Sequence, residues 1–475
     1  MRINLSILNQ VVKPLWVKYV FFTFLILICV VPDVLAVLYA PIYIDSGYYL
    51  SIVERINDGL IPYTDFTLGY TPFVFYFLFL LKYIFSIGIC YEFYLIIHFV
   101  IQALCALLVY QIGLWIIKRK DFSFYAAILF LLTSHWNEGN YVLLETPSLI
   151  WGLLAVYLTL KCSQKIIIFI FIGVCVALAF LSKQYGIVFL GLIIFLLIFN
   201  EAKWKQILFL LIGFLLPVIF CGIIWKSPFF ETLSGNYGFK ITFLSHISKL
   251  FEATKHFFLQ IFPVLLVGLI FIPFILRNAD KIKVRNYIVL LLGIMGFLLQ
   301  FYFWYSPHYF LYIIPFASIL TFLILSDVNK FKWIYSFFLI ITIGYSLYSV
   351  YFNRVDKIYL KRKDIKQTQY NVAREILTKV DKSRTLYISS TNLIAQYYLT
   401  NIVPPNLKTI GYTFGPALNL KTHLLQLKSA DFVLNSTLKP DFDYYESPES
   451  LAFFEKGEKI KISSNSFLFK KLLDE

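Results

Sequence analysis

The sequence predicts a polytopic α-helical membrane protein of about eleven spans, followed by a small α/β domain at the carboxyl end. The 475-residue chain is 59% hydrophobic and has a mean hydropathy of +0.75. Its apolar residues fall into repeated blocks of about 20, the length that crosses ~30 Å of hydrocarbon as a helix. Basic residues gather between these blocks, as membrane topology requires.

The predicted spans lie within residues 1–352. We interpret the first block as an uncleaved span, because it is longer than the apolar core of a usual signal peptide and no small-x-small cleavage site follows it. The eleven blocks are Val17–Leu38, Glu92–Ile117, Phe122–Trp136, Pro147–Leu160, Ile166–Leu181, Gly186–Phe199, Ile207–Trp225, Phe257–Leu276, Tyr287–Tyr305, Tyr309–Leu325 and Trp333–Phe352.

One more block, Pro72–Ile87, decides the topology. It begins with a proline, contains Lys82 and is short for a full crossing. If it stays at the outer face, the basic connectors all share the side of Arg2 and Lys13, which the positive-inside rule makes cytoplasmic. These connectors are Lys118 to Lys120, Lys161 with Lys165, Lys203 with Lys205, Arg277 to Arg285, and Lys330 with Lys332. We therefore predict an inner (plasma) membrane protein with a cytoplasmic amino terminus and an extracytoplasmic carboxyl-terminal domain.

Residues 353–475 contain no block able to span a membrane. The segment "QYNVAREILTKV" has helical periodicity, whereas "TLYIS", "DFVLN" and "KIKIS" have the pattern of short strands. This composition predicts a small soluble α/β domain on the outer side.

Charge and cysteine usage exclude other classes. The formal charge of +15 comes largely from basic residues at the ends of apolar blocks, so it indicates topology and not nucleic-acid binding. The cysteines have no metal-like spacing and lie in or beside apolar blocks, at Cys29, Cys90, Cys105, Cys162, Cys175 and Cys221.

The first outer loop, residues 40–91, contains a helix with Asp45 at its start. On local rules alone, Asp45 and Ser46 cap this helix and Gly59 ends it. The apolar positions recur at helical spacing, at Tyr49, Ile52, Val53 and Ile56. This predicts an amphipathic helix at the membrane interface, with Glu54, Asn57 and Asp58 towards water.

The same residues carry a resemblance to a known family. Asp45, Gly47-Tyr48-Tyr49, "NDGLIPYTDF" and "YTPF" resemble the first outer loop of polyprenyl-phosphate-sugar-dependent glycosyltransferases of the GT-C fold. The nearest group is the glycosyltransferase family 39-like enzymes, which include aminoarabinose transferases and relatives of protein O-mannosyltransferases. Further similarity runs through Leu144-Glu145-Thr146-Pro147, "ALAFLSKQYG", "PHYFLYIIP" and "LYISS...AQYYLTNIVPP".

The resemblance implies an integral-membrane inverting transferase. It would move a hexosyl or pentosyl group from a polyprenyl-phosphate donor to a lipid, glycan or protein of the cell envelope, as in lipopolysaccharide or glycan biosynthesis. Membrane lipid would surround it. An inverting transfer needs a base for the acceptor's proton, and the resemblance gives this role to Asp45.

Glu145 is the second catalytic candidate that the resemblance implies. It would assist Asp45, orient the acceptor or bind a divalent ion such as Mg²⁺ or Mn²⁺ with Asp45; its simpler interpretation is a carboxylate at a helix N-terminus. Ser46 stands where relatives have a second acidic residue, which puts metal binding by this motif in doubt.

The substrate-binding candidates are more weakly marked. Lys183 is basic on the predicted outer side, so it is a candidate for the donor phosphate with Gln184 and Tyr185, unless it snorkels to the interface. His308 and Tyr309 are candidate substrate contacts or interfacial side chains. Tyr48 and Tyr49 have the same two interpretations, with an interfacial belt considered first. We expect Glu138 to be solvated and Asp65 to be part of the loop structure, with a sugar contact as the alternative for Asp65.

Two other functions share a polytopic architecture. A flippase or transporter of lipid-linked glycans would place ionisable residues inside its spans and often has repeated halves, and neither is evident in the sequence. A polymerase or ligase would have an arginine-rich outer loop, but the connector Lys226–His256 has no arginine.

Overall fold

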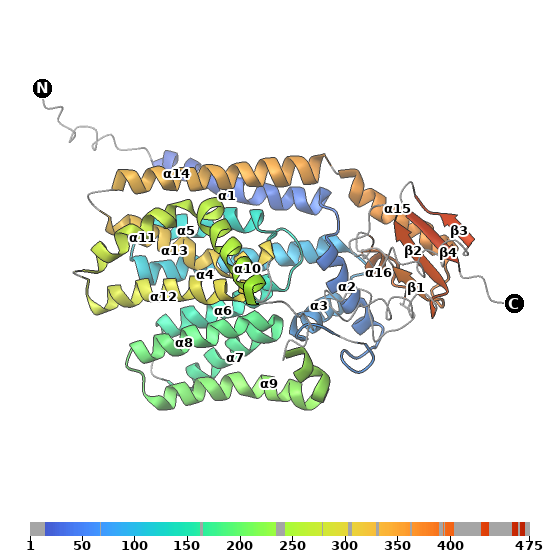
Figure 1. Ribbon diagram of the computed structural model, residues 1–475, viewed down its shortest axis with the longest axis horizontal. Helices are drawn as coiled ribbons and strands as arrows, with labels where there is room; N and C mark the ends of the chain where they lie inside the picture. Colours follow the sequence, from blue (N-terminus) through green and yellow to red (C-terminus); the bar gives the residue numbers. More distant parts are fainter. Residues whose placement is uncertain are drawn as a thin grey trace, which may run out of the picture.

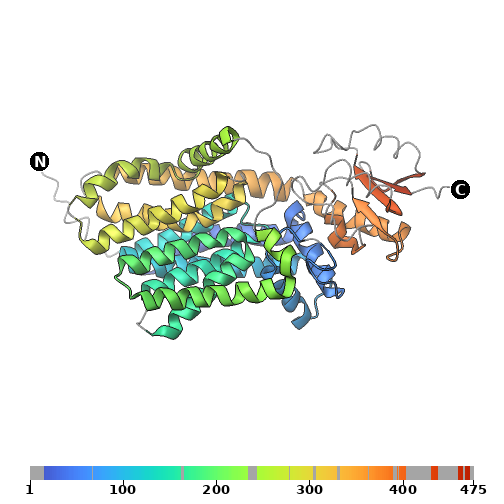
Figure 2. The same cartoon turned by 60° about the horizontal axis from the view of Figure 1, so that its bottom comes forward.

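The computed structural model describes residues 15–66, 68–161, 165–233, 243–277, 279–302, 306–328, 332–361, 363–388, 393, 395–402, 429–436, 458–463 and 466–470. Long helices run side by side along the longest axis, and a smaller domain lies beyond one end of this bundle (Figures 1 and 2). Helix α1 (Leu15–Tyr39) begins at the other end.

The bundle helices correspond to the predicted spans in order. They are α1 (Leu15–Tyr39), α4 (Tyr91–Ile117), α5 (Lys120–Trp136), α6 (Glu145–Lys161), α7 (Ile166–Ser182), α8 (Ile187–Phe199), α9 (Trp204–Leu233), α11 (Pro263–Leu276), α12 (Lys281–Leu298), α13 (Ile314–Asp327) and α14 (Lys332–Tyr348). Irregular or short helical segments extend or join them, at η1 (Gln184–Gly186), α10 (Phe243–Lys255), η2 (His256–Ile261), η3 (Leu299–Tyr302), η4 (Pro307–Tyr312) and η5 (Ser349–Leu360).

The chain is an integral membrane protein by the character of these helices. Among the described residues, four helices are long and apolar enough to cross a membrane, or up to six if each of two bent pairs forms one span. Large apolar side chains face outward from the bundle, as on α9 at Leu216, Ile219, Phe220 and Ile223. Such a continuous apolar surface is stable against lipid and not against water.

The disputed block Pro72–Ile87 contains α3 (Phe73–Ile84). Twelve helical residues rise about 18 Å, which is well short of the hydrocarbon thickness. The buried ammonium of Lys82, on the last turn, forms an ion pair with Glu54. A helix this short favours the prediction that Pro72–Ile87 stays at one face of the membrane and does not cross it.

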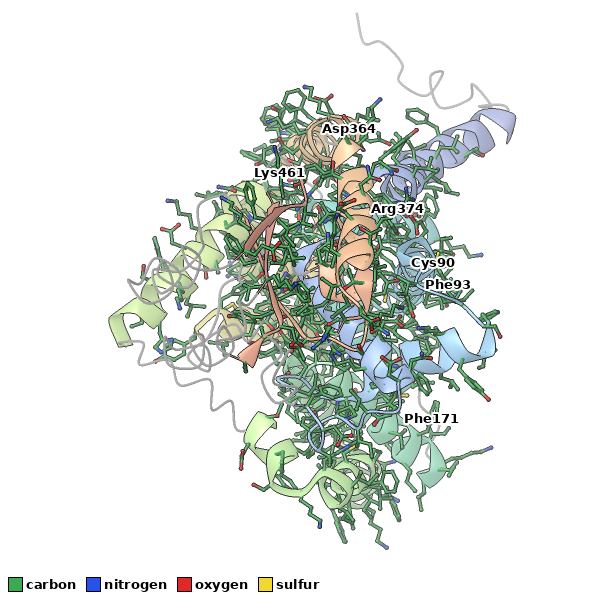
Figure 3. All side chains as sticks on the ribbon, turned by 90° about the vertical axis from the view of Figure 1, so that its right-hand side faces the viewer. Cys90, Phe93, Phe171, Asp364, Arg374 and Lys461 are labelled. Atoms are coloured by element: carbon green, nitrogen blue, oxygen red, sulfur yellow. The ribbon has the colours of Figure 1, made fainter. Side chains whose placement is uncertain are left out.

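The first outer loop and the carboxyl-terminal domain meet at one end of the bundle. Helix α2 (Ile44–Asn57) turns by 65° from α1 and packs against α3 and against α16 (Ala395–Thr400) of the domain. Figure 3 views the molecule from this end, where α15 (Lys363–Lys379), with Asp364 and Arg374 labelled, crosses the end of the bundle.

The boundaries of α2 follow from local chemistry. Pro41 disfavours helix at the residue before it, and α1 ends at Tyr39. At the other end Gly59 has a φ of +86°, where its amide donates to Ile56 and the amide of Leu60 donates to Arg55. This is a Schellman arrangement, and it confirms the predicted glycine stop.

The prediction for the polar face of α2 is wrong at Glu54 and confirmed at Asn57 and Asp58, which are exposed. Tyr49, Ile52, Val53 and Ile56 are buried as expected, but Asp45 to Ile56 are all buried and Glu54 is only 2% exposed. The physical reason is tertiary: α3 covers the face that the local pattern assigns to water, and the ammonium of Lys82 compensates the carboxylate of Glu54.

The carboxyl-terminal domain contains a four-stranded sheet covered by α15. The strands are β1 (Leu386–Ile388), β2 (Phe432–Ser436), β3 (Glu458–Lys461) and β4 (Ser466–Lys470), in the order β1-β2-β4-β3. β1 and β2 are parallel, and the other two pairs are antiparallel. Val372 and Ile376 of α15 pack against Leu434 and Leu468. The helix and the strands expected at β1, β2 and β3 are therefore present, and β4 was not predicted.

Candidate active site

The candidate site lies where several helices meet at the end of the bundle that is next to the carboxyl-terminal domain. Asp45 is the second residue of α2 and is 6% exposed. The N-cap of α2 is Tyr43, and no side chain caps it, so the predicted capping role of Asp45 is wrong. Because the N-cap of α2 lies two residues earlier than expected, Asp45 belongs to the first turn and its side chain is enclosed by the protein.

Four charged side chains that are distant in sequence influence the pKa of Asp45. They are His308, Lys183, Glu145 and Glu138. Burial raises the pKa of Asp45 above its ordinary value, and the nearby cations His308 and Lys183 oppose this effect. A carboxyl group in this setting holds a proton more readily than an exposed aspartate does.

Glu145 and Lys183 form a buried ion pair. The Nζ atom of Lys183 lies 3.1 Å from Oε1 of Glu145, and both side chains are almost fully enclosed. Glu145 is the first residue of α6, where Pro147 fits because its missing amide hydrogen lies in the first turn. Lys183 stands in an extended conformation between α7 and η1. The snorkelling interpretation of Lys183 is therefore wrong, since its ammonium is inside the protein.

His308 joins two carboxylates. Its Nδ1 atom lies 3.0 Å from Oε2 of Glu138, and its Nε2 atom lies 3.7 Å from Oε1 of Glu145. Burial alone would lower the pKa of His308, but Glu145 and Glu138 outweigh it and the net shift is upward. The imidazolium form of His308 therefore persists to a higher pH than that of an ordinary histidine.

Glu138 is largely enclosed and paired, so its expected exposure to water is wrong. It also accepts a hydrogen bond of 3.2 Å from the hydroxyl of Tyr43, and its side chain is 12% exposed. Burial raises the pKa of Glu138, but the hydrogen bond and charge of His308 outweigh burial and hold it below the usual value. Glu138 has a φ of +64°, a left-handed conformation that is unfavourable for a residue other than glycine and that is often found at functional sites.

Aromatic rings surround this polar cluster. The Nζ atom of Lys183 lies 4.4 Å from the centre of the Tyr70 ring and 5.4 Å from that of Tyr309. Tyr70 also contacts Tyr48 and Tyr49, both of which are buried. An interfacial belt role for Tyr48 and Tyr49 is therefore wrong. The rings place cation–π partners on the Lys183 ammonium and keep the surrounding dielectric low.

The remaining predicted site residues lie close to these. Tyr185 meets Tyr309 in a T-shaped contact with ring centres 4.9 Å apart, and Nε2 of Gln184 is buried without a hydrogen-bond partner among the described residues. Asp65 accepts a hydrogen bond of 2.7 Å from the amide of Ile61, which confirms its loop role.

Sequence reasoning missed two features. Tyr70 carries no signal of its own in the sequence, because its contacts with Tyr48, Tyr49 and Lys183 depend on tertiary packing. Nδ1 of His135 on α5 lies 3.4 Å from Oδ1 of Asp33 on α1, a contact that is ionic only when the imidazole is protonated, although no ionisable residue inside the spans was evident in the sequence. The pair could have been found only by asking which polar residues lie within apolar blocks.

A metal site does not emerge from the described part of the chain, which contains no group of three or more histidine, cysteine, aspartate or glutamate side chains suited to hold an ion. Glu145 is approached by two cationic groups, Lys183 and His308. Both cationic groups contact Oε1 and compete with Mg²⁺ or Mn²⁺ for this oxygen, whereas Oε2 has no hydrogen-bond partner among the described residues.

Comparison with known proteins identifies the fold. No protein-family model and no curated protein sequence matches the chain. The crystal structure of ArnT from Cupriavidus metallidurans in the apo state has a TM-score of 0.60 at 15% identity, covering 95% of this chain and 98% of that one. The same protein bound to undecaprenyl phosphate has a TM-score of 0.56 at 14% identity, covering 96% and 98%.

A third similar structure is archaeal. The oligosaccharyltransferase AglB from Archaeoglobus fulgidus, in complex with an inhibitory peptide and a dolichol-phosphate, has a TM-score of 0.53 at 13% identity, with 93% of this chain and 71% of that chain covered. These similarities span nearly the whole chain and show that it has the GT-C fold, which confirms the resemblance.

Proposed function

We propose that this protein is an integral-membrane inverting glycosyltransferase that moves a sugar from a polyprenyl-phosphate carrier to an acceptor in the cell envelope. The observation that carries the proposal is the convergence of one buried carboxyl group, Asp45, with two buried cations, Lys183 and His308. The fold supports it, because similar structures hold undecaprenyl phosphate or dolichol-phosphate. The sugar and the particular acceptor stay open.

The proposed reaction is a displacement at the anomeric carbon of the donor sugar. The acceptor hydroxyl oxygen forms a bond to this carbon while the bond from the carbon to the carrier phosphate oxygen breaks. Asp45 takes the hydroxyl proton, and the carrier phosphate leaves with the bonding electron pair. General-base assistance of this kind is typically worth about 10²- to 10⁴-fold in rate.

The cations stabilise the departing phosphate. Lys183 supplies a point charge held by Glu145 and by the Tyr70 ring, and His308 supplies a second charge held by Glu138. Charges fixed in a site of low dielectric need little reorganisation when the phosphate charge develops. Glu145 is a positioning residue in this scheme, because it acts through Lys183 and His308.

A divalent ion has no role in this scheme, because the proposed step uses side chains already present in the cluster. Adding a chelator to the purified protein should therefore leave the rate of transfer unchanged. We also propose that the site opens on the extracytoplasmic side of the inner membrane, since it lies at the end of the bundle that carries the carboxyl-terminal domain.

The test is a screen of the purified protein against several polyprenyl-phosphate sugars in liposomes. We expect at least one donor to release free polyprenyl phosphate as its sugar reaches the acceptor. Movement of intact donor from one leaflet to the other without this release would instead favour a flippase. The Asp33–His135 pair is compatible with that alternative, because transporters place ionisable residues inside their spans.

A further inference from the structure

The joint between α1 and α2 is held by a side chain from the carboxyl-terminal part of the chain. Residues 40–43 lie outside both helices, between the end of α1 and the first turn of α2 that contains Asp45. The amide of Ile42 donates to Oε1 of Gln369 at 2.9 Å, and Nε2 of Gln369 donates to the carbonyl of Ile42 at 3.0 Å. One glutamine thus satisfies both polar backbone groups of a residue that is 3% exposed.

Gln369 is itself held from the domain side. It lies on α15, and its carbonyl accepts a hydrogen bond of 3.1 Å from Nε2 of Gln396 on α16. Lys366, one turn earlier on α15, donates at 2.8 Å to the carbonyl of Val37 near the end of α1. The joint therefore contacts α15 on consecutive turns.

Helix α16 completes the contact next to the candidate base. A Cβ atom built on Gly47 would lie 2.8 Å from the Cα atom of Ala395, so the two backbones touch without intervening side chains. Gly47 is two residues after Asp45. Movement of α16 or α15 would therefore displace the first turn of α2 directly.

We propose that Gln369 is a positioning residue that fixes the α1–α2 joint and thereby aims Asp45 at the acceptor hydroxyl. The inference rests on the proposed function for its catalytic part. A base must lie within hydrogen-bond reach of the proton that it takes, and a misplacement of about 1 Å can lower a rate about 10²-fold. A primary amide suits this joint because it donates and accepts at once.

The experiment compares Gln369→Ala and Gln369→Glu with the control Gln367→Ala. Gln367 is an exposed neighbour on the same helix that bonds only locally, to Asn371. Gln369→Ala should lower kcat about 10- to 100-fold with an unchanged donor KM, because base alignment matters in the transition state only. Gln369→Glu keeps the acceptor for the Ile42 amide but sets a carboxylate oxygen against the Ile42 carbonyl, so kcat should fall in this variant as well.

Two further readouts separate positioning from general damage. Hydrogen–deuterium exchange of residues 40–47 should rise in Gln369→Ala and stay at the wild-type level in Gln367→Ala. In an Asp45→Asn background, Gln369→Ala should cause little additional loss of transfer, because it acts through a base that is already absent. Unchanged exchange at residues 40–47, or an equal fold-loss with and without Asp45, would overturn the inference. If the wild-type protein transferred no sugar, the proposed function would fall, and the exchange measurement would still decide the role of Gln369 at the joint.

Discussion

At the residue scale, Lys183 illustrates how a buried pair complicates a mutational test. Lys183→Ala leaves the carboxylate of Glu145 enclosed without its partner at 3.1 Å, and such a loss is typically worth about 3–5 kcal/mol of stability. A lower activity of this variant would therefore mix misfolding with loss of phosphate binding.

The double variant Lys183→Met with Glu145→Gln removes both charges and separates these effects. We expect it to melt nearer to the wild-type temperature than Lys183→Ala does, and still to require more donor for half-maximal transfer. Lys183→Arg should retain part of the donor affinity, since the charge stays while its geometry changes. Donor titrations normalised to folded protein make the comparison, and wild-type donor affinity in the double variant would remove Lys183 from the phosphate site.

His308 gives a pH dependence with a definite sign. The pKa of His308 is raised in the folded protein above 6.5, its ordinary value, because Glu145 and Glu138 outweigh burial. Protonated His308 therefore stabilises the folded protein fully at a pH below its pKa in the unfolded state. This stabilisation is lost as the pH rises through its pKa in the folded state. Melting temperatures of the wild type and His308→Gln, measured from about pH 6 to about pH 9, should differ most at the acidic end. A difference that stays constant across this range would mean that the imidazolium does not stabilise the site.

At the element scale, the contact between α2 and α16 is tight enough to test with one methyl group. Gly47→Ala places a Cβ atom 2.8 Å from backbone, and overpacking of this kind typically costs about 1–3 kcal/mol. Gly344→Ala is the matched control, since its Cβ atom would meet open space on α14. Thermal unfolding and protease release of the carboxyl-terminal domain should respond to the first variant only. Equal melting temperatures and equal protease release in both variants would show that α16 shifts away from the added methyl group at no measurable cost in stability.

The same elements show what local sequence patterns predict and what they do not. The buried face of α2, its stop at Gly59 and the helix α15 follow from periodicity and backbone chemistry, and the structure confirms them. The predicted exposure of Glu54 to water is wrong, because α3 packs over this side chain. Its ion-pair partner on α3, Lys82, is 28 residues away in the sequence. Glu138 was assigned to solvent because its partner His308 is 170 residues distant. Partners this far apart leave no periodic signal near either residue.

At the scale of the whole molecule, the prediction concerns the direction of insertion. The last turns of α4, α6, α8, α11 and α13 lie at the end of the bundle opposite the carboxyl-terminal domain (Figures 1 and 2). The basic connectors follow these helices, so the positive-inside rule places that end in the cytoplasm. Reporter fusions after Lys120, Lys165, Lys205 and Lys332 should report the cytoplasm, and a fusion after Glu475 the opposite side. A cytoplasmic carboxyl terminus would require Pro72–Ile87 to span, and it would move the candidate site to the other face.

The central claim is that the carboxyl group of Asp45 takes a proton during sugar transfer. Because Tyr43 and not Asp45 is the N-cap of α2, Asp45→Asn removes the basic oxygen without removing a cap. Its amide keeps nearly the same shape but accepts no proton at neutral pH. The decisive measurement is the rate of sugar transfer from a lipid-linked donor in liposomes, normalised to folded protein, for the wild type and Asp45→Asn. We predict a fall of about 10²- to 10⁴-fold with unchanged melting temperature. Transfer by Asp45→Asn at near the wild-type rate would contradict the account.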